Sequence, residues 1–451
     1  MPNLSDRRRR IPQAVAAPAV ARSIGILDLS RRFWNSLSSQ HLSFILVCIY
    51  LIIEYNRPQQ IWSFLAPIPW AQLAVVAGLT FTAVDPQSTR PPFSTLALLA
   101  LFACCVIAAA TAAQLPDRPW TPTTTVLSWI VVVIFVVSTV SNRDRLIVFL
   151  LVYYLVNFKM AQHGFRTWAA RGFGMASWGV TGSPGWFSNS GEFGMQMAML
   201  TPLLVSHLFA VRRTMTRGLL FAACTFLVMV VGSVIASNSR GAILGLAVLA
   251  AWLLIQSKNR IRAALSIAVA FALVLAVTPD ETLDRFSTAG DDKTSVTRLT
   301  YWKQGLESIK EHPVLGVGLG NWVPYIERRN QAIFSDAGRA EVMHNTPLEV
   351  ATELGLLGLL LFVATIVYIY AANASSLARA RRVGDGFLAS TASGLNGMLL
   401  VYLVTSFFMS VFQYPYFWVL LALTVACAQV QQPRGRQVGP APRPAPVRQG
   451  G

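Results

Sequence analysis

The chain has 451 residues, of which 54% are hydrophobic and only 13% are charged. This composition is too apolar for an ordinary soluble domain. The formal net charge of +17 would point to a nucleic-acid partner in a soluble protein. The placement of that charge along this chain argues instead for a membrane protein, and no nucleic-acid partner is expected.

A transmembrane helix needs about 20 mainly apolar residues, and about twelve stretches of the chain approach that requirement. They are centred near residues 42–55, 63–84, 93–114, 124–141, 145–160, 193–211, 216–237, 241–256, 261–279, 347–370, 387–412 and 415–430. The sequence therefore predicts an all-α polytopic membrane protein with about 12 transmembrane helices.

Basic residues gather in alternate connections between these stretches: Arg7 to Arg10 with Arg31 and Arg32, Arg143 and Arg145, Arg212, Arg213 and Arg217, Lys258, Arg260 and Arg262, Arg379, Arg381 and Arg382, and Arg434 to Arg448. Short cytoplasmic loops retain Lys and Arg. An even number of spans then places both termini in the cytoplasm. Two long connections, 161–192 and 280–344, are predicted to lie outside.

The predicted organisation has three parts. Residues 1–40 form a basic cytoplasmic tail without structure, and no removable signal peptide is evident in it. Residues 41–430 form the transmembrane domain. Residues 431–451 form a Pro-, Gly- and Arg-rich cytoplasmic tail that is typical of disorder. The five cysteines lie in apolar stretches without metal-ligand spacing, so we expect neither disulfides nor a metal cluster.

The longer outer connection contains a sequence pattern that is typical of a helix. In SVTRLTYWKQGLESIKEHP, apolar residues recur at three- and four-residue steps, which predicts an amphipathic helix that ends before Pro313. The following GVGLGN, residues 316–321, lacks the spacing and context of a phosphate-binding loop and is predicted to be a flexible turn.

The segment HNTPLEVATELG, residues 344–355, places several polar residues at the start of a predicted transmembrane helix. Thr346 and Glu349 fit a capping box around Pro347. Glu353 lies one turn deeper, where a carboxylate needs a polar cavity or an interhelical partner, and both interpretations remain open. His344 precedes the positive end of the helix, which favours a neutral imidazole that accepts a proton. The alternative is a loop histidine bonded to backbone.

Arginines on the outer side need an explanation because basic residues favour the cytoplasmic side. Arg240 lies in the first turn of a predicted helix, where an anionic partner would offset the helix dipole. Alternatively, Arg240 contacts lipid phosphates. Arg298, at the start of the predicted amphipathic helix, is either a second anion-binding residue or a solvated loop charge. Arg166 and Arg171 flank the shorter outer connection, where a surface role and a supporting site role remain open.

These residue types suggest one chemistry. Guanidinium groups bind diphosphate bidentately and keep their charge. A nearby histidine can activate a hydroxyl, and aromatic side chains such as Trp186, Phe187 and Trp322 can hold a lipid tail or sugar rings. The acidic doublet Asp291-Asp292 is interpreted as a solvated turn, and we expect no metal and no cofactor.

Three segments in order, ASNSRGAILGLAV, RLTYWKQGLESIKEHPVLGVGLGNW and HNTPLEVATELGLLGLLLF, resemble the O-antigen ligase and polymerase family of bacterial envelope glycosyltransferases. The earlier GWFSNSGEFGMQMAMLTPLL is similar to a weaker segment of that family. The resemblance covers about residues 185–370; beyond it only the topology agrees.

The resemblance implies a C-type glycosyltransferase architecture in the bacterial inner membrane, with a helical periplasmic loop and a periplasmic site. Such enzymes pass a glycan from undecaprenyl diphosphate to a hydroxyl acceptor, such as lipid A-core or a polysaccharide, without metal and with inversion. By motif, Arg240 and Arg298 would bind the diphosphate, and His344 would activate or orient the acceptor. Glu353 falls in the E-x-G element, whose role the resemblance leaves unassigned.

Alternatives remain at this point. The modest 161–192 connection leans towards a ligase, but an O-antigen or exopolysaccharide polymerase and a protein O-oligosaccharyltransferase belong to the same family. A secondary transporter is a different class. It would place ionisable groups near the bilayer midplane, often in repeated halves, whereas here they gather at span ends. A scaffold for an envelope assembly complex is a third possibility.

Overall fold

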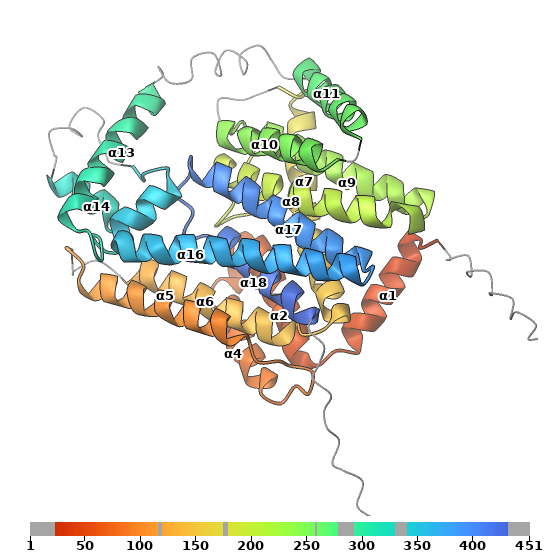
Figure 1. Ribbon diagram of the computed structural model, residues 1–451, viewed down its shortest axis with the longest axis horizontal. Coiled ribbons are helices and arrows are strands. Elements are labelled where there is room, and N and C mark those ends of the chain that lie inside the picture. Colours follow the sequence, from red (N-terminus) through yellow and green to blue (C-terminus); the bar gives the residue numbers. More distant parts are fainter. Residues whose placement is uncertain are drawn as a thin grey trace, which may run out of the picture.

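The computed structural model describes residues 23–115, 120–174, 179–257, 259–277, 293–329 and 341–431. These residues form long α-helices that lie side by side, and the described part contains no strand beyond one isolated bridge between Ile24 and Met215 (Figure 1). Residues 1–22 and 432–451, which make up most of the predicted tails, lie outside the described residues, as does the doublet Asp291-Asp292.

Each of the twelve apolar stretches coincides with a helix: α2 (Leu42–Asn56), α4 (Trp70–Thr82), α5 (Phe93–Thr111), α6 (Thr121–Thr139), α7 (Arg143–Ala170), α8 (Ser190–Val211), α9 (Arg217–Ala236), α10 (Arg240–Gln256), α11 (Arg260–Val277), α16 (Thr346–Arg382), α17 (Gly386–Ser406) and α18 (Pro415–Val430). Among the described helices, seven are long and apolar enough to cross a membrane. They are α5, α6, α7, α8, α9, α16 and α17. The helical membrane class is confirmed, and the count of about 12 stays a prediction.

Small residues allow the central helices to approach closely. A Cβ atom on Gly394 of α17 would lie 2.8 Å from Leu203 Cα, and one on Gly397 would lie 2.5 Å from Pro202 Cβ of α8. Close packing of this kind holds helices together where lipid supplies no hydrophobic driving force. The contact between α8 and α17 forms the middle of the bundle.

One end of the bundle carries the predicted cytoplasmic arginines, and we call it the basic end. Arg145 is fully buried there and donates from Nη1 to Asp85 Oδ2 at 2.8 Å and to the Thr139 carbonyl at 3.0 Å. Arg143 forms an ion pair with Asp385 at the start of α17. The connection between α6 and α7 is therefore joined to the α4–α5 and α16–α17 connections at this end.

Two boundaries differ from the predicted ones. Ile26–Ser38 form helix α1, so the prediction of an unstructured segment is wrong for these residues. The helix is amphipathic: Phe33 and Leu37 pack on the core beside α7, while Arg31 and Arg32 are exposed. In addition, α7 continues to Ala170, ten residues into the predicted 161–192 connection, because its helical pattern runs unbroken past residue 160.

The opposite end carries the longer connections. The predicted amphipathic helix is confirmed as α13 (Lys293–Glu311), which packs against α16, and a second short helix, α14 (Trp322–Arg329), follows it. Both lie at the left of Figure 1, beside the first turns of α16 and far from α1. We call this the site end of the bundle.

Candidate functional site

The start of α16 is fixed by long-range contacts. Its N-cap is Asn345, whose side chain accepts from the Leu348 N–H at 3.0 Å, so the capping box predicted on Thr346 is wrong. Thr346 instead donates from Oγ1 to the Met409 carbonyl at 2.6 Å and accepts from the Val411 N–H at 3.0 Å. Since Thr346 is occupied by the connection between α17 and α18, the neighbouring asparagine takes the capping role.

His344 directly precedes this cap and adopts a left-handed backbone conformation, with φ at 51°. Such a conformation costs a non-glycine residue about 1–3 kcal/mol and persists where the surroundings enforce it, often at functional sites. The enforcing contact is a hydrogen bond from the His344 N–H to Ser410 Oγ at 3.0 Å. The backbone that carries the imidazole is thereby fixed by the connection between α17 and α18.

The electrostatic surroundings keep this imidazole neutral. Burial lowers the pKa of His344, the positive charge of Arg298 lowers it further, and the Glu341 carboxylate, 3.8 Å from Nε2, opposes both effects. A neutral imidazole is the form that accepts a proton. The same interaction places Arg298, near the start of α13, close enough to His344 to act on its charge.

Glu349 hydrogen-bonds a different partner from the one that the capping box predicted. The Ser410 hydroxyl, which accepts the His344 N–H, also hydrogen-bonds the Glu349 carboxylate. The other carboxylate oxygen, Oε2, is shielded from solvent and has no hydrogen-bond partner among the described residues. Ser410 thus links His344 to the carboxylate of Glu349, for which the sequence had predicted only a capping role. The link depends on a residue more than 60 positions further along the chain.

Arg240 is the first residue of α10, as predicted, and Ser239 caps that helix by accepting from the Ala242 N–H at 3.4 Å. The α17–α18 connection lies against this helix start, because a Cβ atom on Gly241 would be 3.2 Å from Phe408 Cβ. Two residues later the same connection binds His344 through Ser410. The starts of α10 and α16 therefore meet the same short segment at the site end.

Glu353 serves a structural purpose that the sequence left open. It is 3% exposed and accepts from the Gly320 N–H at 2.9 Å and from the Trp322 N–H at 3.2 Å. Trp322 opens α14, so the carboxylate fixes the residue 316–321 turn and the start of that helix. Rather than the flexible turn predicted, this segment is docked on α16.

Gly355 completes this arrangement. It has φ at 69° inside α16, and a Cβ atom there would lie 2.2 Å from the Val314 carbonyl oxygen. The break in the helix lets the Leu356 N–H bond the Pro313 carbonyl at 2.8 Å, while the Val317 N–H bonds the Thr352 carbonyl at 3.0 Å. The E-x-G element therefore joins the α13–α14 connection to the helix that carries His344.

We expect Glu353→Gln to weaken both folding and transfer. The amide keeps one acceptor oxygen but presents an NH2 group to the other backbone N–H, and a buried unsatisfied donor costs about 1–3 kcal/mol. Thermal unfolding in detergent should occur at a lower temperature. The exposed Glu341 provides the control, since Glu341→Gln should leave the melting temperature unchanged. Equal melting temperatures for Glu353→Gln and the native chain would contradict this positioning role.

The two arginines predicted as supporting residues lie at the end of α7. Arg166 lies near the end of α7 and Arg171 is its C-cap, and both are exposed. No hydrogen bond or ion pair links either to His344 in the described part of the chain. A supporting role for them stays a prediction.

Of a second cluster near the site, the sequence analysis had singled out only Trp186. Arg57 adopts φ of 43° and stacks over Trp186 at 4.8 Å, while Glu54 bonds both side chains. Trp186 contacts Tyr414, whose hydroxyl hydrogen-bonds Glu192 at the start of α8. A positive φ is invisible in the sequence, and only the outer position of Arg57 offered a signal.

The fold and the candidate site define a polytopic helical membrane protein. The histidine, arginines and carboxylates of its site lie near the starts of helices. Residues 224–363 match the family described as O-antigen ligase, in agreement with the resemblance found in the sequence. The matched region contains Arg240, Arg298, His344 and Glu353. Residues 36–209 match a family of unknown function. No curated protein matches the chain.

Proposed function

We propose that this chain is a glycosyltransferase that moves a glycan from undecaprenyl diphosphate to a hydroxyl acceptor at the site end. The observation that carries the proposal is His344, fixed by its N–H on Ser410, with the cationic Arg298 close enough to lower the pKa of its imidazole. A base and a permanent cation in one place suit a reaction that consumes a hydroxyl proton and releases an anion.

In the proposed step, the acceptor oxygen attacks the anomeric carbon of the donor glycan. The new C–O bond forms as the bond from that carbon to the diphosphate oxygen breaks, and the hydroxyl proton passes to the His344 imidazole. A single displacement inverts the anomeric configuration. The lipid diphosphate leaves with the bonding electron pair and takes up no proton from the acceptor.

Arg240 and Arg298 are proposed to hold the diphosphate before and after this step. Guanidinium forks match phosphate oxygens with two parallel hydrogen bonds. Arg240 also opens α10, and the positive end of a helix favours anions. Charge that develops on the leaving diphosphate is thus stabilised by groups already in position, and the proposal assigns no metal to the step.

The proposed orientation places the basic end in the cytoplasm and the site end in the periplasm of a bacterial inner membrane. The arginines joined at the basic end support it, since short cytoplasmic loops retain positive charge. Lipid-linked glycan and an acceptor such as lipid A-core or a polysaccharide would then meet on the outer side.

The decisive experiment incubates purified protein with undecaprenyl diphosphate-linked glycan and separate candidate acceptors, in buffer with and without EDTA. We expect glycan on one acceptor class, inverted anomeric configuration and no effect of EDTA. A single addition identifies a ligase, a ladder of products identifies a polymerase, and transfer to a protein identifies an oligosaccharyltransferase. Retained configuration, or an intact donor with every acceptor, would overturn the proposed mechanism.

A further inference from the structure

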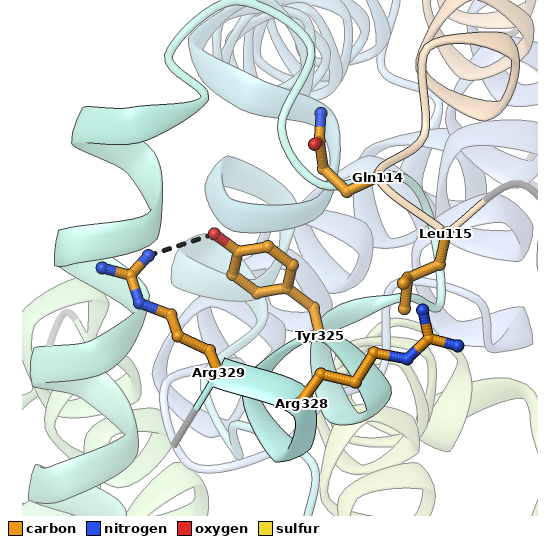
Figure 2. Close-up of a pocket in the computed structure, with 5 residues that line it drawn as sticks. All are labelled: Gln114, Leu115, Tyr325, Arg328 and Arg329. Carbon is orange, nitrogen blue, oxygen red and sulfur yellow. Dashed lines mark hydrogen bonds between the residues drawn. The ribbon is translucent and has the colours of Figure 1, made fainter. Parts of the chain in front are cut away.

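An open pocket of about 370 Å³ lies at the site end, away from His344. It is lined by Gln114, Leu115, Tyr325, Arg328 and Arg329 (Figure 2). The last three residues come from α14 and the first two from the connection between α5 and α6. Figure 2 shows Tyr325 between the two arginine side chains, with Gln114 and Leu115 across from the helix. Its volume falls within the range of small-molecule sites.

The two arginines of this pocket are in different electrostatic situations. Arg329 forms an ion pair with Glu311 and donates to the Tyr325 hydroxyl at 3.1 Å. Arg328 is exposed, and no hydrogen bond or ion pair joins it to another described residue. The charge of Arg329 is therefore balanced by Glu311, whereas Arg328 gives the described pocket lining a net positive charge.

Tyr325 is held in place between them. Besides the bond from Arg329, its hydroxyl lies 3.3 Å from His312 Nε2, and the two rings pack edge to face at 5.7 Å. An aromatic ring fixed at one polar end offers its apolar body to a ligand without loss of rotamer freedom.

The opposite wall is also fixed. The Gln114 N–H donates to the Val317 carbonyl at 3.3 Å, and Leu115 is only 6% exposed. A Cβ atom on Gly318 would meet Ala113 at 2.7 Å, which shows how closely the glycine turn lies on this connection. Both walls are thus attached to the turn that Glu353 secures. The pocket is formed in advance of binding.

We propose that this pocket binds an anionic sugar unit of a glycan, one that carries a carboxylate or a phosphate. The Arg328 guanidinium would pair with the anion, the Tyr325 ring would pack on the sugar ring, and the Gln114 amide would bond sugar hydroxyls. The inference rests on the proposed function and deepens it, because it names a class of glycan that the enzyme selects.

A small apolar cluster connects the helix that lines the pocket to the segment that carries His344. Tyr301, Trp322, Ile326 and Met343 pack together, and Met343 directly precedes His344. The cluster joins α13 and α14 to the start of α16. The helix that carries the pocket arginines is therefore held rigidly relative to the segment that carries His344.

The test measures binding to the full-length protein in detergent by calorimetry. The probes are trigalacturonic acid, glucose 6-phosphate and the neutral maltotriose. We expect one of the two anionic probes to bind more tightly than maltotriose, with affinity that falls as salt rises. Which of them binds distinguishes a carboxylate from a phosphate. Arg328→Ala should weaken that binding about tenfold or more, since a hydrogen bond to a charged group is lost.

Arg382→Ala, at the basic end, is the matched control and should bind as the native chain does. Equal affinity for all three probes, or unchanged binding by Arg328→Ala, would refute the pocket's role. Binding needs no turnover, so His344→Ala should retain it. Loss of transfer in His344→Ala together with native probe binding in Arg328→Ala would leave the proposed function standing and reject only this inference.

Discussion

His344→Ala is expected to abolish glycan transfer while the protein stays folded and in the membrane. The residue is held by its backbone N–H on Ser410, which the substitution retains, and its side chain is 28% exposed. Loss of a general base lowers a rate by about 10²–10⁴-fold. The measurement is the initial rate of transfer from purified lipid-linked donor, with melting temperature as the check on folding.

His163→Ala is the matched control, since that histidine is exposed on α7. It should transfer at the native rate. A native rate for His344→Ala, in protein that melts normally, would remove the base from the mechanism.

The pH dependence of transfer follows from the charge beside His344. Because burial and Arg298 lower the pKa of His344, the imidazole stays neutral below the ordinary histidine value of about 6.5. The rate should therefore fall only at still lower pH, as the base becomes protonated. Arg298→Gln removes the repulsion, so the acid limb of its residual activity should move to higher pH. An unmoved limb would mean that the imidazole titration does not limit the rate.

Much of the helical framework was predictable because its signals are local. Apolar length locates the helices, and the spacing within residues 295–313 predicted α13 correctly. The predicted placement of Arg240 in the first turn of a helix is also confirmed, since α10 begins at that residue. Such features depend on neighbours within a few positions along the chain.

The finer arrangement of the site was not predictable because its contacts are distant in sequence. Asn345 and Thr346 are both good capping residues, and only the contact of Thr346 with the α17–α18 connection decides between them. Likewise, Glu353 binds backbone groups 31 and 33 residues earlier in the chain. The fold supplies these partners, and with them the role of Glu349 beside Ser410.

Arg240→Lys is expected to weaken donor binding and transfer by about tenfold to a hundredfold, although it preserves the charge. The partly buried position at the start of α10 limits how far a side chain can shift, so an ammonium keeps the attraction to a diphosphate but loses the planar pair of hydrogen bonds. Titration with a fluorescent lipid diphosphate measures this loss. Arg262→Lys, an exposed arginine near the start of α11, should bind as the native chain does. If Arg240→Lys also bound normally, charge alone would hold the donor, and the bidentate contact proposed for Arg240 would be absent.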